Sequence, residues 1–169
     1  DVDVTNVTPG NSLPGNFAEI PGGQGNFRSE QPTIEELAKL FEDYPDIERV
    51  IRMNDNGDGE LTMKSEKDYV EGTNREYIWF NAHNPWKSKN DYTLHSTPGY
   101  TGAVKLGLAE LNQGNTYIHC SHGADRTGFI VAAYIKERLG WDNERLWEYT
   151  VAFNGWDGGY EGCCTNAKY

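Results

Sequence analysis

The segment that decides the fold covers residues 116–140, TYIHCSHGADRTGFIVAAYIKERLG. Its first four residues are typical of a short buried strand, and the apolar residues after Thr127 recur at helical spacing up to Leu139. Gly140 is a typical residue for ending such a helix. A polar loop that contains glycine therefore joins a strand directly to a helix, and Cys120 and Arg126 enclose its five middle residues.

Around this segment the sequence alternates predicted helices and strands. Thr33 and Glu36 form a capping box at the start of one helix. Helices are predicted over 33–43, near 64–72, over 99–112 and from 142 or 143 through 151, and strands over 47–53 and 77–80. This alternation predicts an α/β fold with a central, mainly parallel sheet and helices on both faces. Residues 1–26 predict a loop-rich arm, since 1–27 hold five Gly, three Pro and four Asn, and residues 27–169 predict a single domain.

Composition and charge restrict the possible partners. The length of 169 residues suits one domain, and a hydrophobic content of 37% is enough for a core. The formal net charge of −11 repels other polyanions, so we expect no nucleic-acid partner. No run of about 18 apolar residues is present, so we expect no membrane span. Three cysteines, two of them adjacent at Cys163 and Cys164, do not form a spaced disulfide framework, which favours a reducing, cytoplasmic location.

The loop between Cys120 and Arg126 has the length of an anion-binding cup. At this spacing the backbone can curl so that its N–H groups point inward, and the following helix adds its positive N-terminal end. The guanidinium of Arg126 can hold two phosphate oxygens, and Gly123 leaves room for the turn. The predicted phosphate-binding residues are therefore Ser121, His122, Gly123, Ala124, Asp125 and Arg126.

The positive electrostatic potential of the loop N–H groups, the helix N-terminus and Arg126 favours the thiolate form of Cys120. Cys120 is therefore the candidate nucleophile. Thr127 can donate its hydroxyl to the sulfur and so stabilise it as a leaving group. His119 is expected to support the loop from behind rather than to titrate during the reaction. This chemistry needs neither a metal nor a cofactor.

The segment His119 to Gly128 resembles the HCx5R(S/T)G signature of the protein tyrosine phosphatase superfamily, in the CxxGxDRTG form of the dual-specificity phosphatases. Three further segments resemble parts of the family: Phe27 to Pro32 resembles its FRSxQP entry strand, Arg49 to Met53 its VINLR-like strand, and Gly158 to Tyr160 the Gly-rich turn near its end. The resemblance implies a dual-specificity phosphatase-like fold and hydrolysis of phosphomonoesters through a phosphocysteine. The implied substrate is a phosphorylated protein or a small phosphoester.

The general acid is the least defined part of the predicted site. Asp91 lies 29 residues before Cys120, which matches the usual position of the acid in relatives, and it is the preferred candidate. Asp125 is the alternative, although its other role is to hold the loop. A histidine from the polar 83–95 segment is a third possibility.

Other interpretations stay open. Rhodanese-like sulfurtransferases and arsenate reductases also use loops between a cysteine and an arginine. An inositol phosphate or phosphoinositide phosphatase is a further alternative, although His122 and Ala124 stand where such enzymes carry lysine. A module that binds phosphoproteins without hydrolysing them is a fourth.

Two weaker motifs complete the sequence. Asn54 to Gly59 resembles the front of a calcium-binding loop, but Ser65 stands where the bidentate glutamate should be, so we interpret the segment as a turn. Cys163 and Cys164 are either a resolving thiol pair for Cys120 or unremarkable cysteines.

Overall fold

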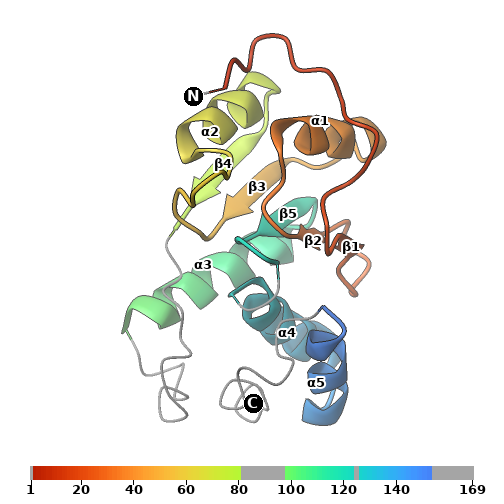
Figure 1. Ribbon diagram of the computed structural model, residues 1–169. Coiled ribbons are helices and arrows are strands. Elements are labelled where there is room, and N and C mark those ends of the chain that lie inside the picture. Colours follow the sequence, from red (N-terminus) through yellow and green to blue (C-terminus); the bar gives the residue numbers. More distant parts are fainter. Residues whose placement is uncertain (1, 81–97, 124–125, 154–169) are drawn as a thin grey trace.

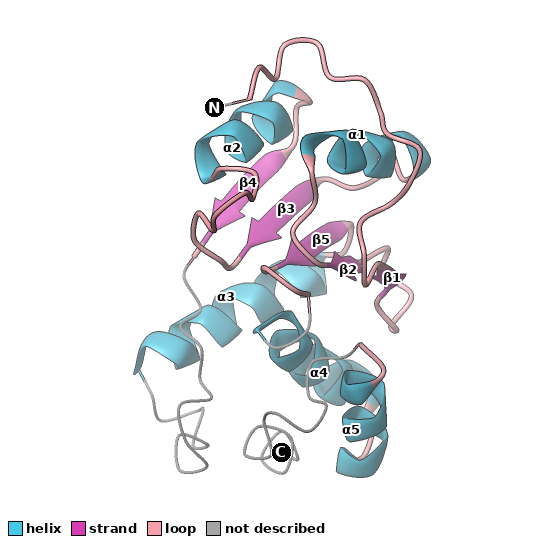
Figure 2. Ribbon diagram, viewed as in Figure 1, coloured by secondary structure: helices cyan, strands magenta, loops and turns pink. Residues whose placement is uncertain are grey.

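A five-stranded sheet lies between two layers of helices in the computed structural model, which describes residues 2–80, 98–123 and 126–153 (Figures 1 and 2). The strands are β1 (Ala18–Glu19), β2 (Phe27–Ser29), β3 (Arg49–Arg52), β4 (Glu76–Trp79) and β5 (Thr116–His119). The helices are α1 (Ile34–Asp43), α2 (Met63–Gly72), α3 (Pro98–Gln113), α4 (Arg126–Leu139) and α5 (Asn143–Val151). The strand order is β1-β2-β5-β3-β4, in which β1 pairs antiparallel with β2 and the other pairs are parallel.

Local signals explain where the helices begin and end. In α1 the backbone N–H of Glu36 donates to Thr33 Oγ1 at 3.1 Å, and the Thr33 N–H donates to Glu36 Oε1 at 2.8 Å. This reciprocal pair is the predicted capping box. Helix α4 begins at Arg126, immediately after the loop, and ends before Gly140, whose φ of 67° favours glycine.

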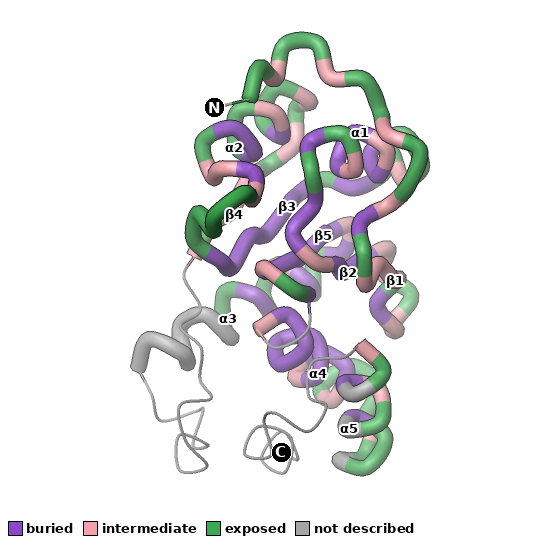
Figure 3. Tube along the Cα trace, in the orientation of Figure 1, coloured by how far each residue is buried: buried purple, intermediate pink, exposed green. Residues whose placement is uncertain are grey.

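The two faces of the sheet build two separate cores because successive side chains of a strand point to opposite sides. Val50 of β3 and Tyr117 of β5 pack against α1 and α2. Their neighbours Ile51 and Ile118 pack on the other face, where α4 contributes more buried residues than any other element. Figure 3 shows the buried central strands β3 and β5 and the buried part of α4, with exposed residues on the outer surfaces.

The predicted fold class is confirmed, and each predicted helix and strand is present within a few residues of its expected bounds. Strand β1 was not predicted, because two residues are too short to show an alternating pattern. The segment around it is integrated into the fold. Ile20 is buried in the core beside α4, and the Asn26 side chain donates to Leu111 O at 2.8 Å and accepts from Thr116 N at 3.0 Å.

No helix in the described ranges combines the length and the apolar character that crossing a bilayer requires.

Candidate active site

The carboxyl ends of three parallel strands meet at one edge of the sheet, and this edge carries the Cys120 loop. Cys120 directly follows β5, Glu30 follows β2, and Met53 follows β3. Helix α4 starts at the other end of the loop, at Arg126. In open α/β sheets this edge is the usual place for a ligand.

Three successive carbonyl groups of the loop are held by donors from the N-terminal part of the chain. The Gln31 N–H donates to Ser121 O at 3.0 Å. The Asn16 side-chain amide donates to His122 O at 2.9 Å, and the Arg28 guanidinium donates to Gly123 O at 2.7 Å. The carbonyls of the loop therefore point toward residues 16–31.

The direction of these carbonyls determines the direction of the backbone N–H groups. In a trans peptide unit the C=O and the N–H point to opposite sides of the chain. Because the carbonyls of Ser121 and His122 point outward, the N–H groups of His122 and Gly123 point to the opposite, inner side. An anion-binding cup of the kind that the sequence predicts requires this direction of the N–H groups.

Gly123 is required by two features of its position. Its φ of 72° lies in the left-handed region, which side chains other than glycine rarely adopt. A Cβ atom would also lie 2.5 Å from backbone atoms of Ser29 and Glu30. The loop consequently packs directly against the end of β2.

The structure places Cys120, Arg126 and Thr127 at the same junction of strand, loop and helix. Cys120 is only 2% exposed and is not in a disulfide. The partly exposed Arg126 donates to Met53 O at 3.2 Å and forms no ion pair with any described carboxylate. The buried hydroxyl of Thr127 has no hydrogen-bond partner in the described part of the chain. The Ser121 side chain points away to Glu60, with Oγ 2.8 Å from Oε2, and the side chain of His122 is exposed.

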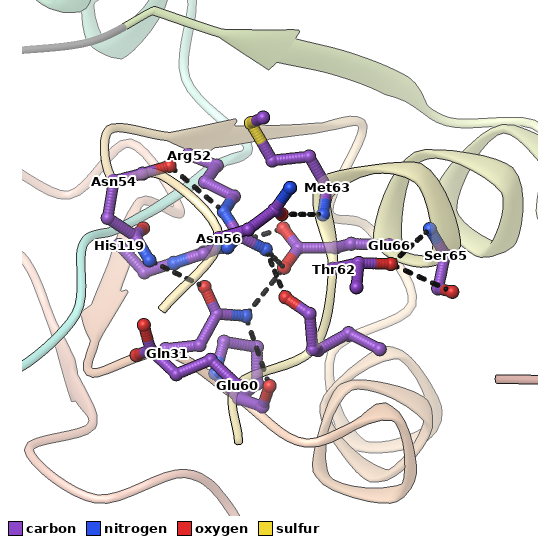
Figure 4. A network of polar contacts seen from close by, with 12 residues as sticks. Gln31, Arg52, Asn54, Asn56, Glu60, Thr62, Met63, Ser65, Glu66 and His119 are labelled. Atoms are coloured by element: carbon purple, nitrogen blue, oxygen red, sulfur yellow. Dashed lines mark hydrogen bonds and ion pairs between the residues drawn. The ribbon is translucent and has the colours of Figure 1, made fainter. Parts of the chain in front are cut away.

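A buried network lies behind the loop and connects β3, β5 and the segment after β2 to α2 (Figure 4). His119 Nδ1 lies 3.4 Å from Cys120 O, and Nε2 lies 2.7 Å from Glu66 Oε2. Since a carboxylate only accepts, Nε2 carries a proton. The other Glu66 oxygen accepts from Arg52 Nη1 at 3.2 Å and from Gln31 Nε2 at 2.6 Å. His119 therefore connects the start of the loop to Glu66 of α2.

Glu66 is ionised at neutral pH despite its complete burial. Burial alone raises the pKa of this carboxyl, but the adjacent His119 and Arg52 and the hydrogen bond from Gln31 outweigh it and lower the pKa below the ordinary value. The Glu66 carboxylate thus neutralises the buried guanidinium of Arg52 and accepts the hydrogen bond from His119.

The segment after β3, which the sequence analysis interprets as a turn, wraps around Arg52. The guanidinium of Arg52 donates hydrogen bonds to the carbonyls of Asn54 at 3.2 Å, Asp55 at 2.8 Å and Leu61 at 2.7 Å. Ser65 hydrogen-bonds Thr62 at the start of α2. In the described part of the chain, no group of three or more His, Cys, Asp or Glu side chains is placed to hold a metal ion.

Sequence reasoning missed five side chains that hold the loop or its support: Asn16, Arg28, Gln31, Glu60 and Glu66. Arg28 and Gln31 lie in the segment Phe27 to Pro32, where the resemblance to the family marked the segment but assigned no role to its side chains. Glu66 could have been found from helix periodicity. It lies four residues before Val70 and so shares the buried face of α2 with it.

Several predicted residues lie outside the described part of the chain. These are the general-acid candidates Asp91 and Asp125, the loop residue Ala124, the histidines His83 and His95, the pair Cys163 and Cys164, and the segment Gly158 to Tyr160.

Comparison with known proteins supports the fold. No family model and no curated protein matches the sequence. The core catalytic domain of the PP-IP phosphatase SIW14 from S. cerevisiae is 18% identical, with a TM-score of 0.65 over 96% of this chain and 86% of that chain. TpbA from P. aeruginosa is 19% identical, with a TM-score of 0.58 over 90% and 80%. A putative phosphatase from Shewanella putrefaciens CN-32 is 13% identical, with a TM-score of 0.62 over 92% and 88%.

The chain has the fold of these three structures, of which one is named a PP-IP phosphatase and another a putative phosphatase. The expected dual-specificity phosphatase-like architecture is confirmed.

The buried network leads to a prediction for Glu66→Gln. The substitution keeps the shape but removes the counter-charge of Arg52, so it should lower the free energy of unfolding at pH 7 by about 3 kcal/mol. Because the pKa of Glu66 is lowered by folding, its contribution is complete above the ordinary value of 4.5 and is lost as the pH falls through the folded-state pKa. The deficit of the variant should thus shrink below that pH, as measured by urea unfolding across a pH series.

Glu71→Gln is the control, because Glu71 is exposed on the same helix. An equal stability loss in both variants, or a deficit for Glu66→Gln that grows on acidification, would contradict the assigned network.

Proposed function

We propose that the chain is a cysteine-dependent phosphomonoester hydrolase that acts through a phosphocysteine intermediate. One observation carries this proposal: the carbonyls of Ser121, His122 and Gly123 are held outward by three separate donors. A loop held in this way presents N–H groups to an anion next to the Cys120 thiol. The likeness to phosphatase structures agrees with this function.

In the first step the Cys120 sulfur attacks the phosphorus in line. An S–P bond forms while the ester P–O bond breaks, and the leaving oxygen takes a proton from the general acid. Arg126 and the inward N–H groups stabilise the charge on the three equatorial oxygens. Arg126 is suited to this role because no described carboxylate neutralises it.

In the second step a water molecule gives a proton to the deprotonated general acid and attacks the phosphocysteine. The S–P bond breaks, and phosphate leaves with the oxygen of the water. The sulfur now departs as a thiolate. The buried hydroxyl of Thr127, which has no partner in the described ranges, is suited to donate a hydrogen bond to that sulfur.

For the general acid we keep Asp91 ahead of Asp125, on its spacing of 29 residues from Cys120. The true acid is identified by leaving-group dependence. Its replacement by Asn should slow tyrosyl phosphates strongly and spare substrates with very acidic leaving groups. If Asp91→Asn slows both substrates equally, the role passes to Asp125 or to a histidine of the 83–95 segment.

The substrate class we favour is a singly phosphorylated ester, such as phosphotyrosine or a small phosphomonoester. The similar structures do not decide this point, because SIW14 is a PP-IP phosphatase and a TpbA variant was solved in complex with pTyr. The side chains that contact the loop favour a singly phosphorylated substrate. Among the described side chains that bond to residues 120–123, the only cation is the fully buried Arg28, while the partly exposed Glu60 is an anion. A carboxylate at this edge repels a second phosphate on the substrate.

The proposed reaction predicts different effects for two variants. Cys120→Ser should reduce turnover on the order of a thousandfold or more and should keep tungstate binding, since the loop and Arg126 remain. Arg126→Lys should lose about a hundredfold in kcat and should also weaken tungstate, because an ammonium cannot hold two oxygens. Hydrolysis of an aryl phosphate and thermal stabilisation by tungstate measure both effects.

Wild-type protein that binds tungstate but hydrolyses no aryl phosphate would indicate a phosphate-binding module instead. Near-normal turnover by Cys120→Ser would exclude the covalent mechanism.

The edge carboxylate predicts a change in substrate preference for Glu60→Gln. Loss of one negative charge should raise kcat/KM for inositol hexakisphosphate relative to a phosphotyrosine peptide by about threefold to tenfold at low salt. Glu42→Gln is the control, since Glu42 lies exposed on α1. An unchanged ratio in Glu60→Gln, or an equal change in the control, would show that Glu60 does not select the substrate.

A further inference from the structure

Two fully buried arginines lie in the strands on either side of β5, and they differ sharply in their partners. Arg52 of β3 uses all three guanidinium nitrogens for hydrogen bonds, and its charge faces the Glu66 carboxylate at 3.2 Å. This is the usual state of a buried cation, because an unpaired charge inside a protein is costly.

Arg28 of β2 is equally buried but lacks such partners. Its Nη2 donates to Gly123 O at 2.7 Å, whereas Nε and Nη1 have no hydrogen-bond partner among the described residues. No carboxylate of the described ranges forms an ion pair with it. The described structure thus contains a buried guanidinium without a neutralising anion.

The surroundings of Arg28 only partly compensate for its charge. The guanidinium carbon lies 3.9 Å from the centroid of the Phe153 ring and 5.5 Å from that of Tyr149. Such cation–π contacts attract the guanidinium weakly, but they bring no negative charge to it. Tyr149 adds no negative charge, because burial raises the pKa of its phenol and Arg28 only partly opposes this.

The position of Arg28 points to the missing anion. In the sheet, Arg28 pairs with Ile118, two residues before Cys120, and its bond to Gly123 O places the guanidinium directly beneath the loop. Burial lowers the pKa of Arg28, and Tyr149 and, to a smaller extent, Cys120 act in the opposite direction. The guanidinium remains protonated at any ordinary pH. Of the described residues at this place, Cys120 carries negative charge during the proposed reaction, as its thiolate, and the bound phosphate is a second anion.

We propose that Arg28 is a positioning residue of the proposed phosphatase site, which holds Gly123 O outward and stabilises the Cys120 thiolate with buried positive charge from beneath the loop. The two effects come from one side chain. The donor sets the direction of the loop peptide, and the charge has little screening because it is fully buried. This inference rests on the function proposed above and adds a second arginine with a role distinct from that of Arg126.

Two variants separate the donor from the charge. Arg28→Gln keeps a donor without charge, and Arg28→Lys keeps charge without the guanidinium fork. The measurement is the pH dependence of Cys120 alkylation by iodoacetamide. We expect the midpoint to rise by about one pH unit in Arg28→Gln and by less than half of that in Arg28→Lys. A purely structural role would not order the two variants in this way.

Arg75→Gln is the matched control. Arg75 also lies over an aromatic ring, with its guanidinium carbon 3.9 Å from the Phe41 centroid, and also donates to backbone carbonyls, those of Ile47 and Pro45. It lies at the opposite end of β3, so the alkylation midpoint should stay at the wild-type value.

Equal midpoints in wild type and Arg28→Gln, or equal shifts in the Gln and Lys variants, would overturn the role of Arg28. This outcome is distinct from failure of the proposed function. Alkylation requires no turnover, and hydrolysis of an aryl phosphate by the wild-type protein tests the function separately.

Discussion

The outward direction of the carbonyls between Ser121 and Gly123 is the constraint on which the site depends. A short loop cannot hold this geometry alone, because three adjacent carbonyls without partners would be costly at a partly buried position. Gln31, Asn16 and Arg28 supply the donors, and β1 and β2 bring them to the loop. The N-terminal part of the chain is therefore part of the proposed active site, since it orients the peptide groups that would meet the phosphate.

Buried charge is arranged around the loop in two different ways. Behind it, Glu66 neutralises Arg52 and accepts from His119, which makes a rigid and electrically balanced support. Beneath it, Arg28 keeps its positive charge unneutralised by any described carboxylate. The balanced pair contributes stability, and the unbalanced cation favours an anion at Cys120. Because Glu66 pairs with Arg52 and not with Arg28, its negative charge does not cancel the positive charge of Arg28 beneath the loop.

The sequence predicted those features that depend on local patterns. The capping box at Thr33, the strand and helix around Cys120, and the sheet class follow from spacing within a few residues, and the structure contains all of them. The partners of the loop could not be predicted, because Asn16 lies 106 residues from His122, and Glu66 lies 53 residues from His119. Such contacts depend on strand order and register, which no local periodicity encodes. The antiparallel strand β1 was missed because it is only two residues long.

The central claim is that Cys120 carries the phosphoryl group during turnover. The most direct test uses an aryl phosphate with a very acidic leaving group, so that breakdown of the intermediate is the slow step. Wild-type protein is quenched with denaturant during steady-state turnover, and the peptide that contains Cys120 is analysed by mass spectrometry. The account predicts the mass of one phosphoryl group on Cys120. Turnover with unmodified Cys120, or with the phosphoryl group on another residue, would contradict it.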